Sequence, residues 1–356
     1  MVGPHLAAVC AYDPTERTWN GQVPAVSLLP PHSLFTRAVR RIGFTRHGGA
    51  ADSLRKALRQ FRPEQIVLHY LDFAAQFEAV LNSCDQDVFI HCHGYDITWD
   101  LRNHDTPETP YFNETYKTVV GRLAKRATLI ANSEYTKQQL LSIGVASERI
   151  VVKYLGVPVP QQPRNQCSGG MLRILYFGRL VDCKGPHLTI EAFERASDRG
   201  LEAHLLLAGA GEMKVTCELM KARSRYSDRI RLLGAVDADV GAKLRNTCDI
   251  FTAHNCMGTL THQVEAFGVS IVEAMADSLP VVSTRSGGVV ESVVQDETGL
   301  LVEPGDVEGH ANALLALARD ARRRRGMGEA GWRRAKEHFS VDKERASLLR
   351  ILGLAG

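Results

Sequence analysis

The feature that most constrains this chain is an alternation of short apolar runs with longer amphipathic segments, which occurs twice. In the first series the apolar runs are QIVLHYL (65–71), DVFIHCHG (87–94), TLIANS (128–133) and RIVVKYLGV (149–157). In the second they are LRILYFG (172–178), AHLLLAGAG (203–211), RIRLLGAV (229–236), CDIFTAH (248–254), LPVVST (279–284) and TGLLVEP (298–304). This alternation is typical of parallel βαβ units, so the sequence predicts an α/β protein with two Rossmann-like domains.

A stretch without periodicity separates the two series. Residues 158–170, PVPQQPRNQCSGG, are rich in Pro, Gln, Ser and Gly, as expected of a linker. A chain of 356 residues with 44% hydrophobic content also exceeds what one core usually serves. We therefore expect an N-terminal domain over 1–157, a linker over 158–170, a C-terminal domain over 171–335 and a final helix over 336–356.

Composition limits the classes of function. No apolar run reaches the roughly 18 to 20 residues of a membrane span, and the first residues lack a basic segment followed by an apolar core. The eight cysteines are scattered without a CxxC pair, which favours a reducing compartment and small buried thiols. We expect a cytoplasmic protein, and a net charge of +3 does not favour nucleic acid as a partner.

Positive charge is nevertheless concentrated in one region. Residues 37–62 contain eight Arg and Lys residues and the single acid Asp52. One interpretation is a solvated helix face, and the other is contact with an anionic membrane or an anionic acceptor. The second would place the protein peripherally at the inner face of the cell membrane.

Candidate functional groups follow the predicted strands. They are His93 and Asp96, Arg179 and Lys184, the segment from Glu265 to Ser270, and the pair Gly287 and Gly288. Open α/β sheets bind ligands at the carboxyl ends of their strands, so these groups are expected to meet in a cleft between the two domains.

Arg179 and Lys184 share the loop GRLVDCKG, between a predicted strand and a helix that begins near Pro186. A guanidinium fork and an ammonium point charge together suit a diphosphate. The alternative is that both cations lie on an exposed loop without a ligand.

The segment VEAFGVSIVEAMAD places Glu265 and Glu273 eight positions apart around Gly268. Gly268 permits a tight turn, and a helix that begins at Ser270 would direct free amides and its positive dipole end at an anion. Ser270-Ile-Val-Glu273 also matches the S-x-x-E capping box, so Glu273 is either a cap partner or a ligand-binding residue.

His91 and His93 alternate along one predicted strand and therefore share a face, and H-x-H occurs in metal sites. No acidic or cysteine partner with ligand spacing follows them in the sequence. We therefore expect no metal here, with His91 a buried strand residue and Asp96 either orienting His93 or capping the next element.

With these residues the chain resembles a known family. YFGRLVDCKG, LLAGAGE and VEAFGVSIVEAMADSLPVVSTRSGGVVESVVQDETGLLVEPGD, in that order, resemble the donor-binding domain of retaining GT-B glycosyltransferases of the GT4 kind. HCHGYDI (91–97) resembles the HGxD segment of exopolysaccharide and lipopolysaccharide members. The resemblance implies a GT-B fold, a nucleotide-sugar donor, a glycan or lipid-linked acceptor, and a last helix that returns to the first domain.

The same resemblance implies roles for individual residues. Arg179 and Lys184 would bind the donor diphosphate, and Glu273 the nucleotide ribose. The segment Phe267, Gly268, Val269 and Ser270 would present backbone amides to the sugar and phosphate. Glu265 and His93 would be the catalytic residues that face the transferred sugar from opposite walls. The reaction would retain anomeric configuration and need no metal or other cofactor.

Two alternatives come from other classes. The first forty residues show HLAAVCAY and VPAVSLL as possible strands but lack the Gly-rich loop with which the family begins, which motivates a sugar-nucleotide-binding pseudoenzyme or partner subunit. A nicotinamide-dependent oxidoreductase would need G-x-G-x-x-G after a strand, and AGAGEM (208–213) lacks the third glycine.

Overall fold

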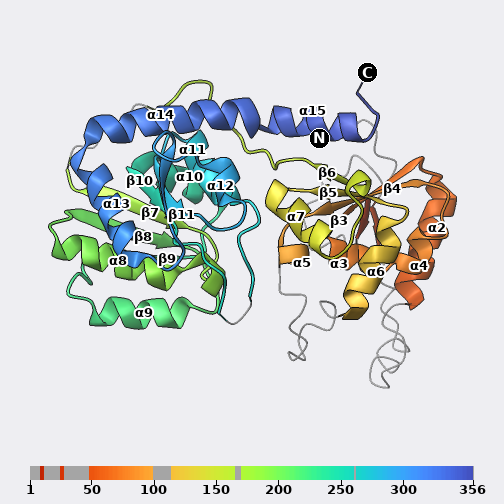
Figure 1. Cartoon of the computed structure of the whole chain (residues 1–356), viewed down its shortest axis with the longest axis horizontal. Helices are drawn as coiled ribbons and strands as arrows, with labels where there is room; N and C mark the ends of the chain where they lie inside the picture. The colour runs from red at the N-terminus through yellow and green to blue at the C-terminus, as the bar shows by residue number, and fades with distance from the viewer. Residues whose placement is uncertain are drawn as a thin grey trace.

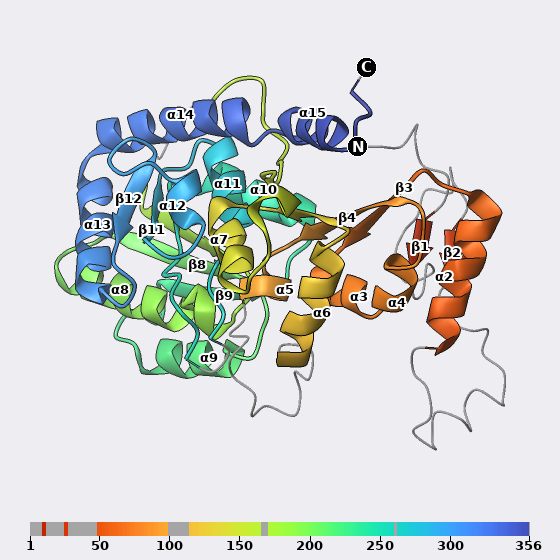
Figure 2. The ribbon, with the colours of Figure 1, turned by 45° about the vertical axis from the view of Figure 1, so that its right-hand side comes forward.

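The computed structural model describes residues 9–11, 25–27, 48–98, 114–164, 170–259 and 262–355. Within these residues the chain forms two larger parallel sheets, one before and one after residues 158–164 (Figure 1), and a separate pair of short parallel strands (Figure 2). The two series of apolar runs therefore form two α/β units, as predicted.

The N-terminal sheet has the strand order β3-β4-β5-β6, so each strand pairs with its neighbour in the sequence. Its strands are β3 (Gln65–His69), β4 (Asp87–Cys92), β5 (Thr128–Ala131) and β6 (Ile150–Val152). The described helices of this unit are α2 (Gly48–Phe61), α3 (Leu71–Ala75), α4 (Glu78–Leu81), α5 (Tyr95–Thr98), α6 (Glu114–Ala124), α7 (Glu134–Ser142) and the 3-10 turn η2 (Ser147–Arg149). The short strands β1 (Val9–Ala11) and β2 (Ala25–Ser27) pair with each other, within the two runs predicted as strands.

The C-terminal sheet has the strand order β12-β11-β10-β7-β8-β9. Its strands are β7 (Leu172–Phe177), β8 (Ala203–Ala208), β9 (Ile230–Gly234), β10 (Ile250–Thr252), β11 (Val281–Thr284) and β12 (Gly299–Val302). The order reverses between β7 and β10, as in the doubly wound dinucleotide-binding sheet. Such sheets bind ligands at this switch point, at the carboxyl ends of the strands.

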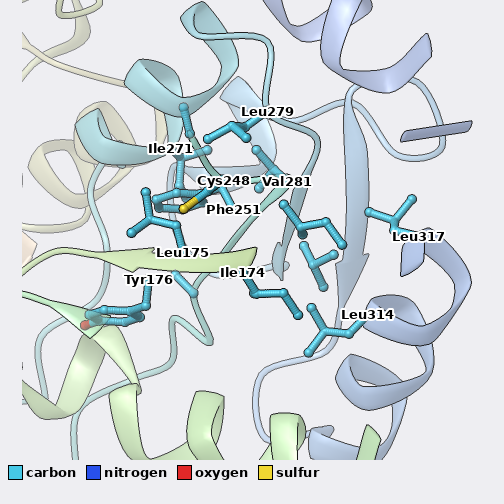
Figure 3. Close-up of a cluster of buried hydrophobic side chains, with 14 of the residues drawn as sticks. Ile174, Leu175, Tyr176, Cys248, Phe251, Ile271, Leu279, Val281, Leu314 and Leu317 are labelled. Atoms are coloured by element: carbon cyan, nitrogen blue, oxygen red, sulfur yellow. The ribbon is translucent and has the colours of Figure 1, made fainter. Parts of the chain in front are cut away.

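Helices surround this second sheet. They are η3 (Asp182–Lys184), α8 (Pro186–Asp198), α9 (Lys214–Arg223), α10 (Ala238–Thr247), α11 (Val269–Ala276), α12 (Val289–Ser292), α13 (Val307–Arg319) and α14 (Ala321–His338). Figure 3 shows Ile271 and Leu279 on one side of the strand residues Ile174 and Leu175, and Leu314 on the other. All five side chains are fully buried, and each contributes about 1.5–3 kcal/mol by leaving water.

The last helix, α15 (Val341–Ile351), follows α14 along the same side of the molecule (Figures 1 and 2). It packs on the N-terminal sheet, where Leu352 forms a small buried cluster with Phe89 and Ile130. The Gln65 side chain donates a hydrogen bond to the Leu352 carbonyl at 2.7 Å. The chain thus crosses from the C-terminal sheet back to the N-terminal sheet at residues 339–340.

A buried ion pair fixes this return. Lys153, which follows β6, pairs with Glu344 on α15, and the two side chains are only 1% and 7% exposed. Glu344 also accepts a hydrogen bond from the Gly156 amide at 3.0 Å. Both charges are therefore satisfied within the protein rather than by water.

Part of the basic region lies outside the described residues, because 28–47 are not described. In the rest, α2 buries Ala50, Leu54 and Ala57 and exposes Lys56 and Arg59. An exposed basic face fits both interpretations made from the sequence. Among the described residues, no helix combines the length and apolar character needed to cross a membrane.

Candidate functional site

Arg179 and Lys184 lie in the loop that follows β7, at the switch point of the C-terminal sheet. The buried Tyr176 hydroxyl donates to the Arg179 carbonyl at 2.7 Å, which fixes the backbone while the Arg179 side chain stays exposed. Lys184 ends the turn η3, and its side chain is 18% exposed. The structure therefore places one exposed cation and one largely buried cation beside the same strand end.

Lys184 is anchored by Glu265, with which it forms a short ion pair. The Glu265 carboxylate is 11% exposed and also accepts hydrogen bonds from the Gly268 amide, at 3.1 Å, and from the Phe267 amide. Burial alone raises the pKa of Glu265, but the Lys184 charge and these hydrogen bonds outweigh it and lower the pKa. Glu265 is therefore ionised at neutral pH and connects the β7 loop to the segment before α11.

Helix α11 begins at Val269, and its N-cap is Gly268, with φ 86° in the left-handed region that glycine adopts without strain. Of the two roles considered for Glu273, the capping box with Ser270 does not form, because Ser270 lies one residue inside the helix and is not its N-cap. Within the described residues, the Val269 and Ser270 amides have no acceptor, as at the start of any helix that lacks a cap. These two amides and the helix dipole make the start of α11 suitable for an anion.

Phe267 contributes to the site only through its backbone. Its ring is 1% exposed and stacks on Tyr154 at a centroid distance of 5.7 Å. The sequence predicted that the amides of residues 267–270 would face a ligand. The Phe267 and Gly268 amides instead donate to the Glu265 carboxylate and orient it. The Val269 and Ser270 amides are available for a ligand.

Glu273 follows one turn later on α11 and forms an ion pair with Arg245 of α10 at 3.2 Å. Arg245 also binds Asp277 at 2.6 Å. Burial raises the pKa of Glu273, and the Arg245 charge partly opposes this shift. Glu273 remains 28% exposed, so its carboxylate is accessible to a hydroxyl donor.

Gly287 and Gly288 pack against the segment that carries Glu265. The Gly288 amide donates to the Glu265 carbonyl at 2.9 Å, and a Cβ on Gly288 would lie 1.9 Å from the Ala266 carbonyl oxygen. A side chain at either position would push this segment away. The glycine pair therefore supports the position of Glu265 from behind.

On the N-terminal side, His93 follows β4 and is half-buried. A Cβ on the next residue, Gly94, would lie 2.2 Å from the Ala266 Cβ, so the two domains are in contact at this point. His93 and Glu265 are the chain neighbours of Gly94 and Ala266, so they lie on facing sides of this contact.

Asp96 holds this loop through the backbone. Its fully buried carboxylate accepts hydrogen bonds from the amides of Leu71, His93 and Gly94 at 2.7, 2.9 and 2.8 Å. Burial raises the pKa of Asp96 to about 6, although these hydrogen bonds favour the ionised form. Of the two roles considered from the sequence, Asp96 orients the His93 backbone and not its imidazole.

The imidazole of His93 instead meets two side chains that sequence reasoning missed, His69 and Tyr70. His93 Nε2 lies 2.8 Å from His69 Nδ1, and the Tyr70 ring lies 4.4 Å from the His93 ring. Tyr70 adopts φ 71°, which is a strained conformation for a residue with a Cβ and typical of functional positions. Burial lowers the pKa of His93 to about 4 and that of His91 to about 2.

A further contact between the domains was not predicted. The Glu291 carboxylate of α12 accepts hydrogen bonds from the Glu134 and Tyr135 amides, both at 2.8 Å, at the start of α7. A carboxylate at a helix N-terminus is favourable for the helix dipole. No local sequence pattern marks this pair, because its members lie more than 150 residues apart.

A surface pocket of about 480 Å³ lies elsewhere, at the beginning of β7, where Leu172, Leu201 and Leu315 are among its lining residues. It is at the opposite end of the strand from Arg179. We assign the site to the strand ends instead, because charged groups and free amides converge there.

The fold defines the class of protein, a GT-B fold of two α/β domains with parallel sheets, so the predicted fold class is confirmed. Residues 162–334 match the family model of group 1 glycosyl transferases, and residues 8–160 match the model of glycosyltransferase family 4. The chain belongs to this glycosyltransferase family.

Solved structures agree in fold. The HepE protein of Anabaena, solved with UDP-glucose, has a TM-score of 0.77 at 18% identity over 99% of this chain and 93% of that one. Sucrose-phosphate synthase of Thermosynechococcus elongatus has a TM-score of 0.75 at 18% identity, over 98% and 89% of the two chains.

Curated relatives match shorter stretches. The amylovoran biosynthesis glycosyltransferase AmsK of Erwinia amylovora is 27% identical over 64% of this chain and 54% of its own length. The N-acetyl-alpha-D-glucosaminyl L-malate synthase of Bacillus anthracis is 32% identical over 44% and 38%. The chain spans 63%, 54% and 38% of the lengths of the first curated relatives that it matches.

Proposed function

We propose that this protein transfers a sugar from a nucleoside-diphosphate donor to a glycan or lipid-linked acceptor, with retention of anomeric configuration. The observation that carries the proposal is the ion pair between Lys184 and Glu265, which joins the cationic loop after β7 to the start of α11. Two cations, two free amides and a helix dipole are thereby held at one switch point, where a diphosphate would bind.

The donor would be held at both ends. Arg179, Lys184 and the amides of Val269 and Ser270 would bind the diphosphate, and Glu273 would accept hydrogen bonds from the ribose hydroxyls. The relative HepE was solved with UDP-glucose, which supports a nucleotide-sugar ligand for this fold.

The chemical step breaks the bond between the sugar and the diphosphate, and negative charge develops on the leaving phosphate. Fixed positive charge at that place stabilises the transition state more than the ground state. The acceptor hydroxyl would attack from the face that the diphosphate leaves, and a phosphate oxygen would take its proton. This step uses no metal ion.

Glu265 and His93 would act on the sugar. Because Glu265 is ionised and its carboxylate is bound by Lys184 and two amides, it can stabilise positive charge on the sugar without leaving its place. Glu265 precedes α11, whereas Glu273 lies on α11 more than one turn after its start and is bound by Arg245. The two glutamates therefore do not form the carboxylate pair of a glycoside hydrolase.

The acceptor would bind on the side of the N-terminal domain. Of the first forty residues, which lack the Gly-rich loop, 1–8, 12–24 and 28–40 lie outside the described residues. The exposed basic face of α2 supports an acceptor carried by an anionic membrane. Retention of the protein on anionic liposomes at low salt tests that part, and its absence would remove it.

Turnover distinguishes an enzyme from a pseudoenzyme or partner subunit. We expect the wild-type protein, incubated with UDP-, GDP-, ADP- and TDP-linked sugars, to release one nucleoside diphosphate slowly by hydrolysis even without an acceptor. The measurement is nucleoside diphosphate over time by chromatography. Binding of a donor without any release, with or without acceptor extracts, would favour the pseudoenzyme.

A further inference from the structure

Three histidines meet at the carboxyl end of the N-terminal sheet, although sequence reasoning considered only two of them. His69 ends β3, and the register of the parallel sheet places it directly beside His91 of β4. His93 follows two residues later on the same face. The ring centroids lie 5.4 Å apart for His69 and His91, 5.1 Å for His69 and His93, and 4.4 Å for His91 and His93.

The ligand atoms converge as well as the rings. One nitrogen from each imidazole lies within 4.8 Å of the others, which a single ion can bridge with small rotations. Imidazole nitrogens are ligands for zinc, copper and nickel, whereas magnesium and calcium prefer oxygen. The donor set therefore indicates a transition-metal ion.

An independent observation comes from His91, which is 4% exposed. Its Nε2 atom is buried and has no hydrogen-bond partner among the described residues. A buried polar atom without a partner is unfavourable by about 1–3 kcal/mol, and a bound ion would supply the partner that His91 Nε2 lacks. His69 and His93 already satisfy each other at 2.8 Å, and His91 alone is left over.

The charges around the cluster allow a cation. Lys153 is the nearby positive group, and its ammonium is paired with the Glu344 carboxylate. His69 is exposed and forms the open side of the cluster. Three protein ligands and one open side are the arrangement of a zinc site that keeps a position for water.

We propose that His69, His91 and His93 bind one divalent transition-metal ion of the zinc kind through three imidazole nitrogens. The site would sit where His93 is expected to face the transferred sugar. One consequence rests on the proposed function: an ion held by His93 withdraws this imidazole from the sugar, so the metal inhibits transfer and competes with the donor.

Cobalt provides the direct test, because bound Co²⁺ absorbs visible light and zinc displaces it. We expect the full-length protein, first treated with chelator, to bind one equivalent of Co²⁺ with a tetrahedral-type visible spectrum that Zn²⁺ abolishes. His69→Gln and His93→Gln should each weaken Co²⁺ binding by at least about tenfold. His338→Gln is the matched control, because His338 is an exposed histidine on α14.

Circular dichroism of each variant shows whether it is folded, and His69→Gln should be, because its side chain is exposed. Absence of a Co²⁺ spectrum in the folded wild type would overturn the proposal, as would equal binding in His69→Gln. This titration needs no sugar and therefore does not depend on the proposed function. Zinc binding that leaves donor hydrolysis unchanged would overturn only the inhibitory consequence.

Discussion

We expect Arg179→Ala to lower the turnover number for sugar transfer by about 100- to 1,000-fold while the free energy of unfolding stays unchanged. The guanidinium is placed where the leaving diphosphate gains charge, so its loss removes an interaction that is strongest in the transition state. The side chain is exposed, and the hydrogen bond from Tyr176 goes to the Arg179 carbonyl, which alanine retains. Steady-state kinetics and thermal unfolding measure the two quantities.

Arg173→Ala is the matched control for this variant. Arg173 is an exposed arginine at the other end of the same strand, β7. It should leave both the turnover number and the stability unchanged. An equal loss of turnover in Arg173→Ala would indicate a general effect of charge on donor attraction, and an unchanged Arg179→Ala would remove this residue from the site.

We expect Glu344→Ala to lower the free energy of unfolding by about 3–5 kcal/mol. The substitution leaves the Lys153 ammonium, whose side chain is 1% exposed, without a partner. It also removes the acceptor of the Gly156 amide. Urea unfolding followed by circular dichroism measures the change.

Two variants distinguish the cost of leaving the buried Lys153 charge unpaired from the cost of losing a carboxylate in the first turn of α15. Asp342→Ala removes an exposed carboxylate from the same turn of α15 and should change stability by less than about 0.5 kcal/mol. The double variant Lys153→Met with Glu344→Leu removes both charges and should recover most of the loss. A double variant as unstable as Glu344→Ala would show that the loss comes from the missing ion pair and the missing acceptor of the Gly156 amide, and not from an unpaired charge on Lys153.

The sequence was sufficient for the parts of the fold that local patterns determine. The apolar runs that became β7, β8, β10 and β11 each contain one strand, because parallel strands buried on both faces need continuous apolar residues. Spacing also placed Arg179 and Lys184 in one loop. These features depend on residues that are close in the chain.

Features that depend on packing between distant segments could not be predicted in the same way. His69 lies 24 positions before His93, and only the strand register shows that their side chains meet. The runs QIVLH and DVFIH both end in histidine. Aligning them as neighbouring parallel strands would have placed His69 beside His91. The S-x-x-E pattern left Glu273 as either a cap partner or a ligand-binding residue, and only the structure shows that the N-cap is Gly268 in its left-handed conformation.

If α11 carries the donor site, the wild type should bind a nucleotide and Glu273→Ala should lose that binding. A ligand that binds only the folded state stabilises it by RT ln(1 + [L]/Kd), so a thermal-shift titration with UDP, GDP, ADP, TDP and NAD reports binding. Asp277→Asn is the control, because Asp277 binds the same Arg245 guanidinium as Glu273. We predict stabilisation by one nucleoside diphosphate that Asp277→Asn retains and Glu273→Ala loses. A response to NAD alone, or to no diphosphate, would contradict the account.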